Sequence, residues 1–106
     1  MKKQRPITDI CRQHIDLETE THSLYIPERN RRVHLTQTEY RIFQALFQEW
    51  LLSDEQLAVK VFKCSGDKSV RECLEKHIDH IRGKIRVYGW DIYRVLHYGY
   101  ILLLAQ

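Results

Sequence analysis

The feature that most constrains this chain is an apolar stripe in its second half. Its five members are spaced four, four, three and four residues apart: Val70, Leu74, Ile78, Ile81 and Ile85. This spacing follows the 3.6-residue period of an α-helix and lines up five aliphatic side chains on one face. The stripe therefore predicts an amphipathic helix of about four turns, over residues 69–86, that buries one face and leaves the other free.

Two shorter helices are predicted before it, each beginning at a capping box. In this motif a Ser or Thr side chain accepts from a backbone amide, and a Glu or Gln three residues later accepts from the cap residue's own amide. Thr36 with Glu39 opens the first helix, and Ser53 with Gln56 opens the second. Residues 69–72 repeat the pattern and predict the start of the long helix. The chain thus contains three successive capped helices.

Short strands are predicted on both sides of the helices, from apolar and polar alternation and from turn residues. Upstream, an antiparallel meander is expected at residues 14–18, 23–26 and 31–35. Downstream, a hairpin around a Gly-containing turn is expected at residues 90–96 and 100–104. The fold class is therefore α+β, a winged helix-turn-helix with N-terminal antiparallel strands, three helices and a C-terminal β-hairpin wing. Its domain covers residues 14–106, and residues 1–13 form an N-terminal arm or linker.

The length and the charge fit one domain with a polarised surface. A chain of 106 residues supports a single domain, and its net charge is only +3. The charge is unevenly placed: residues 60–106 hold nine Lys/Arg against five Asp/Glu, whereas residues 35–59 hold one against four. This asymmetry is expected either of a face turned to a polyanion or of a mixed-charge solvated surface.

Several protein classes are excluded by missing motifs. The first residues lack the apolar core of a secretory signal, and no apolar run approaches the roughly 20 residues of a membrane helix. Three Cys without C-x-x-C spacing indicate reduced thiols and a cytoplasmic protein with no membrane partner. No Walker A, G-x-S-x-G or H-E-x-x-H motif is present, so we expect neither an enzyme nor a bound cofactor.

Four segments resemble motifs of the OmpR/PhoB family of winged-helix DNA-binding domains. Residues 35–40 (LTQTEY) resemble its L-T-x-T-E-[FY] helix opening, and residues 52–57 (LSDEQL) resemble its second-helix start. Residues 77–85 (HIDHIRGKI) resemble its recognition-helix signature H-[VI]-x-x-L-R-x-K-[LI]. Residues 99–102 (GYIL) resemble the G-Y-x-[LF] that ends its wing. The resemblance covers roughly residues 14–104, including the N-terminal strands that most other winged helices lack.

The resemblance implies a sequence-specific duplex-DNA-binding transcription regulator. Its recognition helix, about 69–86, would enter the major groove, and its wing, 90–104, would lie on the minor groove or phosphates. The family further implies a homodimer on direct repeats and contact of the loop 63–68 with RNA polymerase. Its members usually follow a phosphoacceptor receiver domain in a phosphorelay. No α/β domain fits before residue 14, so an excised effector domain and a stand-alone regulator are both open.

The alternative function is a winged-helix module repurposed for protein–protein interaction. The sequence departs from the family at two places where DNA would lie. Asp79 and His80 replace residues that are often basic, and Leu96 with His97 replaces a usual Arg-Gly in the wing. Both departures reduce positive charge on the DNA-facing surface.

The DNA contacts follow from the outward face of the long helix and from the wing. Counted from the buried stripe, Lys76 and His80 point outward toward base edges or nearby phosphates. Gly83 lets the backbone approach DNA closely, and the long Arg and Lys stems reach phosphates. The predicted set is Lys76, His77, His80, Arg82, Gly83, Lys84 and Arg86 on the helix, with Arg94, His97 and Tyr98 in the wing.

A metal site is a minor alternative on the same helix. Cys73, His77 and His80 recur at i, i+4 and i+7, a spacing that can hold a transition metal. No fourth ligand is evident, and His77 already matches the family's own His. We therefore expect no metal at this position.

Overall fold

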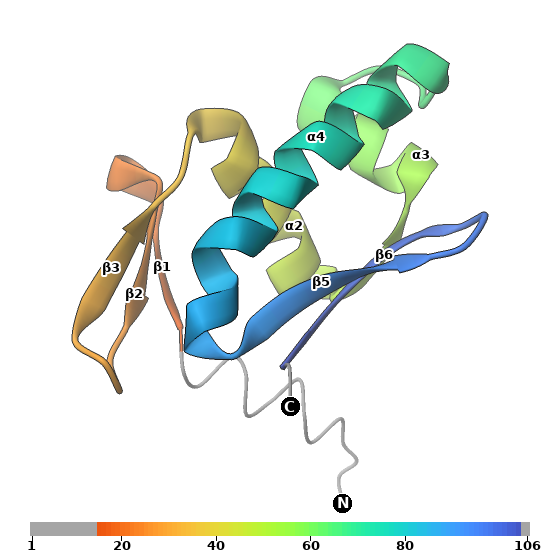
Figure 1. The fold of residues 1–106 in the computed structure, drawn as a ribbon. Helices are drawn as coiled ribbons and strands as arrows, with labels where there is room; N and C mark the ends of the chain where they lie inside the picture. Colours follow the sequence, from red (N-terminus) through yellow and green to blue (C-terminus); the bar gives the residue numbers. More distant parts are fainter. Residues whose placement is uncertain (1–14, 105–106) are drawn as a thin grey trace, which may run out of the picture.

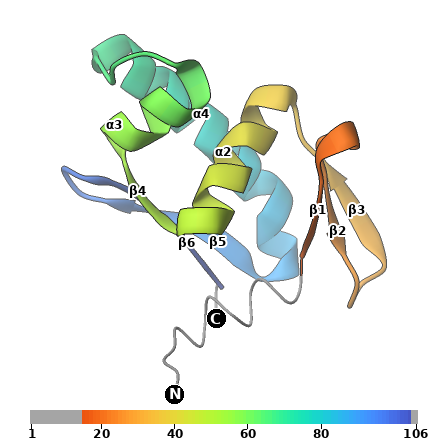
Figure 2. The same ribbon diagram turned by 180° about the vertical axis from the view of Figure 1, so that it is seen from behind.

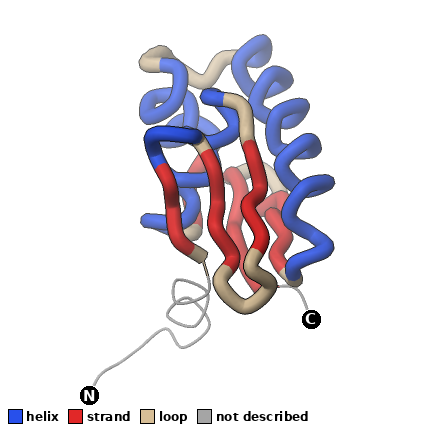
Figure 3. The backbone as a smooth tube through the Cα atoms, turned by 90° about the vertical axis from the view of Figure 1, so that its left-hand side faces the viewer, coloured by secondary structure: helices blue, strands red, loops and turns tan. Residues whose placement is uncertain are grey.

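The structure, a computed structural model, describes residues 15–104 and builds them into two antiparallel sheets and a set of helices (Figure 1). The expected arm 1–13 and the first residue of the expected meander lie outside the described residues. One sheet lies beside the helices and the other beneath them in Figure 1. The N-terminal sheet contains β1 (Asp16–Glu18), β2 (Ser23–Ile26) and β3 (Arg31–His34), in that order. Figure 3 shows these three strands side by side.

The helices follow the N-terminal sheet in the predicted order. They are α2 (Gln37–Glu49), α3 (Asp54–Leu57) continued by a π-helical segment η2 (Ala58–Phe62), and α4 (Lys68–Ile85). Short 3-10 turns, η1 (Thr19–Thr21) and η3 (Arg86–Tyr88), follow β1 and α4. Seen from behind, α2 and α3 lie in front of α4 (Figure 2). Helix α4 and the face formed by α2 and α3 are therefore on opposite sides of the molecule.

The C-terminal sheet forms the wing and ties it to the helices. It contains β4 (Leu51–Ser53), β5 (Trp90–Val95) and β6 (Gly99–Leu104), in the order β4-β6-β5. The hairpin was predicted, but β4 was not. A three-residue strand is too short to show an alternating pattern, yet it pairs with β6, placing Leu52 opposite Tyr100 and Ser53 opposite Gly99. β4 thus fixes the base of the wing directly before α3.

The predicted caps are confirmed in two of three helices. The Thr36 and Ser53 boxes both form, with all four hydrogen bonds between 2.8 and 3.1 Å. The third prediction was wrong: Asp67, not Ser69, caps α4, and its carboxylate accepts from the Val70 amide at 3.0 Å. Asp is as good a cap as Ser, and its position lets the helix begin at Lys68.

The apolar stripe forms the centre of the core as predicted. Leu74, Ile78, Ile81 and Ile85 are buried, and Val70 is partly buried at the start of α4. The helix packs against α2 and β5. Aromatic rings fill the space between those elements: the Phe43 ring centroid on α2 lies 6.5 Å from that of Trp90 on β5. Burial of this stripe fixes which face of α4 remains outside.

Candidate nucleic-acid interface

The outward face of α4 carries the residues that the helical spacing predicted. Lys76, His80 and Gly83 are exposed, whereas His77 is half-buried with its ring centroid 6.4 Å from that of Phe62. The ammonium of Lys76 has no hydrogen-bond or ion-pair partner within residues 15–104. Acidic side chains share this face, because Glu72 and Asp79 are exposed as well. The face therefore mixes a free cation with carboxylates.

The two arginines at the end of α4 converge on one buried carboxylate. Asp91, on β5, accepts from Arg82 Nε at 2.8 Å and from Arg86 Nε at 3.2 Å. The Asp91 side chain is only 9% exposed, and it also accepts from the Ile92 amide at 2.8 Å. Burial alone would raise the pKa of this carboxyl, but the hydrogen bonds from Arg82 and the Ile92 amide outweigh it and lower the pKa below its usual value. The two arginines thus connect the C-terminal end of α4 to strand β5 of the wing.

A second buried carboxylate, Glu39 on α2, holds the C-terminal half of α4. Glu39 accepts the Thr36 amide in its capping box, and the same oxygen accepts Lys84 Nζ at 2.8 Å. Its other oxygen lies 3.7 Å from Nδ1 of His80. Burial of Glu39 opposes ionisation, but the bonds from Lys84 and Thr36 prevail and lower its pKa. Lys84 also donates to the His34 carbonyl at 3.2 Å, so it joins three elements.

The arginine of the wing is tied to the second helix. Both terminal nitrogens of Arg94 donate to Asp54, at 2.7 and 3.1 Å, in a bidentate pair. The guanidinium also lies over the Tyr100 ring, 4.9 Å from its centroid. The hydrogen bond to Asp54 raises the pKa of Arg94 and keeps it charged. This pairing orients the wing relative to α3.

The tip of the wing remains open. Leu96 is 74% exposed, and Tyr98 is 44% exposed. His97 is exposed and has a left-handed backbone, with φ of 61°, which lets the turn close without glycine. The backbone of the tip is held, because the Asp54 amide donates to the Tyr98 carbonyl at 2.8 Å. His97 and Tyr98 thus lie at a fixed turn with exposed side chains.

Four of the ten predicted contacts are therefore cations already paired with acids of the same chain. Sequence reasoning missed the partners Glu39, Asp54 and Asp91 as counter-ions. Glu39 was recognised only as a cap, and Asp91 sits in a run that reads as apolar strand. One signal in the sequence pointed to Asp91: it is an acidic residue within a run of strong strand formers. An acidic side chain that is buried in a strand needs a cationic partner.

The three residues of the alternative metal site do not form one. Within residues 15–104, no three His, Cys, Asp or Glu side chains are grouped so as to hold a metal ion. Along α4 the ring of His77 lies near Phe62, whereas that of His80 lies near Glu39. The exposed Cys73 is left without a second ligand, although all three residues lie in one sector of the helix.

The loop before α4 is hydrogen-bonded to both of the helices that it connects. The Gly66 amide donates to Glu55 Oε1 at 2.8 Å, and Arg71 donates to the Gly66 carbonyl at 2.8 Å. Lys63, Cys64 and Ser65 are exposed at its start. The segment 63–68 is thus an exposed surface of defined shape.

The lowered pKa values of Glu39 and Asp91 predict acid destabilisation. Both carboxyls are ionised in the folded state at pH values where the unfolded chain, with usual pKa values of about 4, binds protons. Their stabilisation is complete above the unfolded-state pKa and is lost as the pH falls through the lower folded-state pKa. Thermal unfolding followed by circular dichroism should show Tm falling below about pH 4. An unchanged pH dependence in a Glu39→Gln, Asp91→Asn double variant would contradict this assignment.

Solved structures of other proteins have a similar fold. One similar structure is the crystal structure of the DNA-binding domain of response regulator AdeR in complex with an intercistronic region. Its TM-score is 0.65 at 23% sequence identity, over 88% of this chain and 95% of that chain. A mutant of RitR gives 0.67 at 25% identity, over 88% of this chain. The match covers only 41% of the RitR chain.

These likenesses define the class of the fold. It is a winged helix-turn-helix, in which α3 with η2 and α4 form the helix-turn-helix and β5 with β6 form the wing. More particularly, it is the OmpR/PhoB-type winged-helix fold with an N-terminal strand sheet, as the resemblance implied. No family model and no curated protein matches the sequence. Among the described residues, no helix has the length and apolar character to cross a membrane.

Proposed function

We propose that this chain is a sequence-specific duplex-DNA-binding transcription regulator. Its recognition helix α4 lies in the major groove, and its wing lies on the minor groove or the phosphates. The observation that carries the proposal is the outward face of α4, which presents unpaired Lys76 beside a wing of fixed orientation. The AdeR domain, which has this fold, was crystallised with an intercistronic region, and that supports the same role here. The proposal assigns binding and no catalysis.

The predicted contact residues differ in how many hydrogen-bond donors they keep for DNA after their contacts within the chain. Lys76 and His80 are the base-edge candidates, with His77 at the flank. A Cβ on Gly83 would meet no atom within 4 Å, so the helix is open to close approach there. A guanidinium has five N–H donors. Arg86 uses only its Nε on Asp91 and keeps its terminal nitrogens for a phosphate, whereas both terminal nitrogens of Arg94 are taken by Asp54.

The internal pairs also set the strength of binding. Arg82, Lys84, Arg86 and Arg94 hold carboxylates of their own chain, so each phosphate they contact shares its cation with an acid. Non-specific affinity for DNA comes mainly from neutralised phosphates and released counterions. We therefore expect a modest, salt-sensitive affinity.

The second candidate function is a winged-helix module for protein–protein interaction. It is favoured by Leu96, a large apolar side chain 74% exposed at the wing tip, and by the internal pairing of the cations. The remaining family features stay proposals: a homodimer on direct repeats, RNA polymerase contact through the loop 63–68, and a cytoplasmic phosphorelay. Direct binding to duplex DNA separates the two functions.

Neutralising Lys76 tests the DNA-binding face. Lys76→Gln should weaken binding to duplex DNA by about tenfold, the loss of one charge-assisted contact of roughly 1.4 kcal/mol. Fluorescence anisotropy with a labelled random duplex at low salt measures the change. The matched control is Arg31→Gln, which removes the same charge from an exposed position on β3. Equal losses in the two variants would reject α4 as the contact surface.

A further inference from the structure

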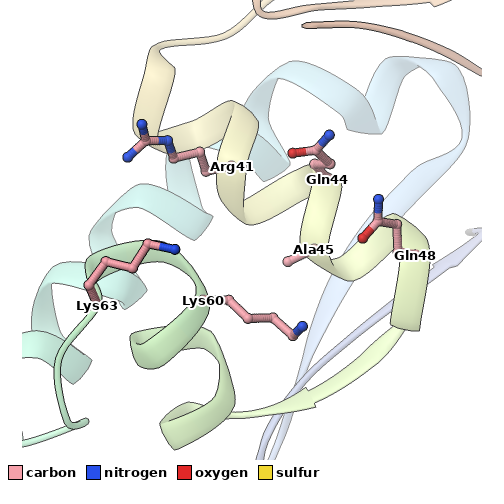
Figure 4. A pocket seen from close by; sticks show the side chains of 6 residues that line it. All are labelled: Arg41, Gln44, Ala45, Gln48, Lys60 and Lys63. Atoms are coloured by element: carbon pink, nitrogen blue, oxygen red, sulfur yellow. The ribbon is translucent and has the colours of Figure 1, made fainter.

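A basic cleft lies on the side of the molecule opposite to the recognition helix. It lies between the outer face of α2 and the segment η2, with a volume of about 340 Å³, and is lined by Arg41, Gln44, Ala45, Gln48, Lys60 and Lys63 (Figure 4). In Figure 2 these elements lie in front of α4. A duplex held on the outward face of α4 is therefore on the far side of the helices from this cleft.

The cations of the cleft differ from those of the DNA-facing surface. Among residues 15–104, no carboxylate lines the cleft, and the exposed Arg41, Lys60 and Lys63 have no side-chain partner. By contrast, the arginines at the end of α4 and in the wing are neutralised by Asp91 and Asp54. An uncompensated positive cluster of three side chains is therefore found here rather than on the recognition helix.

The geometry of the cleft suits a small, multiply charged anion. Arg41, Gln44 and Gln48 recur at helical spacing on α2. Lys60 on η2 and Lys63, the residue directly after η2, line the other side (Figure 4). The buried Ala45 lies between the α2 side chains and the two lysines, and its small side chain leaves space in the cleft. A phosphate ester carries close to two charges at neutral pH and three acceptor oxygens, whereas a carboxylate carries one charge. Guanidinium and ammonium groups are the usual phosphate ligands, and side-chain amides supply further donors.

We propose that this cleft is a binding site for a small phosphate-bearing anion, separate from the DNA-binding surface. Its volume is at the lower end of small-molecule pockets, which favours a diphosphate-sized group over a macromolecular segment. The site joins α2 to η2, which are the two elements that support α4 from behind. A ligand there would bridge the first helix and the helix-turn-helix unit.

Amide chemical shifts of the full chain test the site. Pyrophosphate, added at constant ionic strength, should shift the amide signals of residues 41–48 and 60–63 in a saturable way. A second titration uses ADP in place of pyrophosphate. Tighter binding of ADP than of pyrophosphate would indicate a nucleotide ligand, whereas equal binding would indicate that the site recognises the diphosphate group alone. Lys60→Gln and Lys63→Gln should each weaken the binding about tenfold, whereas Arg31→Gln should leave it unchanged.

Four results would overturn the proposal. The first is the absence of saturable shifts, and the second is a loss in Arg31→Gln as large as in Lys60→Gln. The third is displacement of pyrophosphate by poly-glutamate at equal charge, which would mark the cleft as a docking site for an acidic protein. The fourth is movement of the cleft signals by duplex DNA, which would make the cleft part of the DNA surface. The amide signals of α4 report DNA binding in the same sample. If no anion binds to the cleft, those signals still test the proposed DNA-binding function.

Discussion

Gly99→Ala is expected to destabilise the fold by about 3 kcal/mol, the upper part of the range for overpacking a tightly packed site. Gly99 begins β6 and is buried against β4. A Cβ at this position would overlap the Leu52 carbonyl oxygen and lie 2.6 Å from Ser53 Cα. These are backbone atoms, so no rotamer change relieves the clash, and β4 must separate from β6. The base of the wing and the start of α3 would move with it.

Gly83→Ala is the matched control, because it adds the same methyl group in the opposite environment. Gly83 lies inside α4, and its added Cβ would meet no atom within 4 Å. Alanine is preferred over glycine inside a helix by about 1 kcal/mol, so this variant should be more stable than the parent. Urea unfolding followed by circular dichroism measures both. The account of the β4–β6 contact fails if Gly99→Ala keeps the parent's free energy of unfolding.

Asp91→Ala should cost about 3 kcal/mol, near the lower limit measured when one partner of a buried ion pair is removed. The substitution leaves Arg82 and Arg86 without their shared carboxylate and removes the acceptor of the Ile92 amide. The lower limit applies because both guanidinium groups are partly exposed, which lets water replace some of the lost interaction. Denaturant unfolding gives the change in free energy.

Arg86→Ala provides the comparison for the same cluster. The Arg86 side chain is 56% exposed, and pairs of that exposure contribute about 1 kcal/mol or less. Asp91 keeps Arg82 in this variant, so no buried charge is left unpaired. If Arg86→Ala lowers the free energy of unfolding as much as Asp91→Ala does, burial of the Asp91 carboxylate is not the main cause of the effect.

The sequence was sufficient to predict the elements whose signals are local. The stripe from Val70 to Ile85 and the two capping boxes at Thr36 and Ser53 each lie within one helix, and each was confirmed. The strands and the hairpin were predicted from equally local signals, the alternation of apolar and polar residues and the turn residues. Two local details were missed. Asp67 is an equally good cap two residues upstream of Ser69, and the π-helical η2 has the same composition as an ordinary helix turn.

Features that depend on distant partners could not be predicted in the same way. β4 exists because β6 offers it an edge, and those strands are nearly fifty residues apart. The pairs Lys84–Glu39 and Arg94–Asp54 join residues 45 and 40 positions apart. A pattern of charges shows which residues are cationic, but only the fold shows which of them are already neutralised. The basic C-terminal region is consequently less available to DNA than its composition indicates.

The central claim is that α4 and the wing form a DNA-binding surface whose affinity depends on a few unpaired cations. The direct test is an anisotropy titration of the full chain with a random duplex at about 50 mM and about 200 mM salt. The account predicts binding at the lower salt and a fall of roughly tenfold or more at the higher, as expected when about two phosphates are neutralised. Absence of binding at the lower salt would contradict it and favour the protein-interaction function.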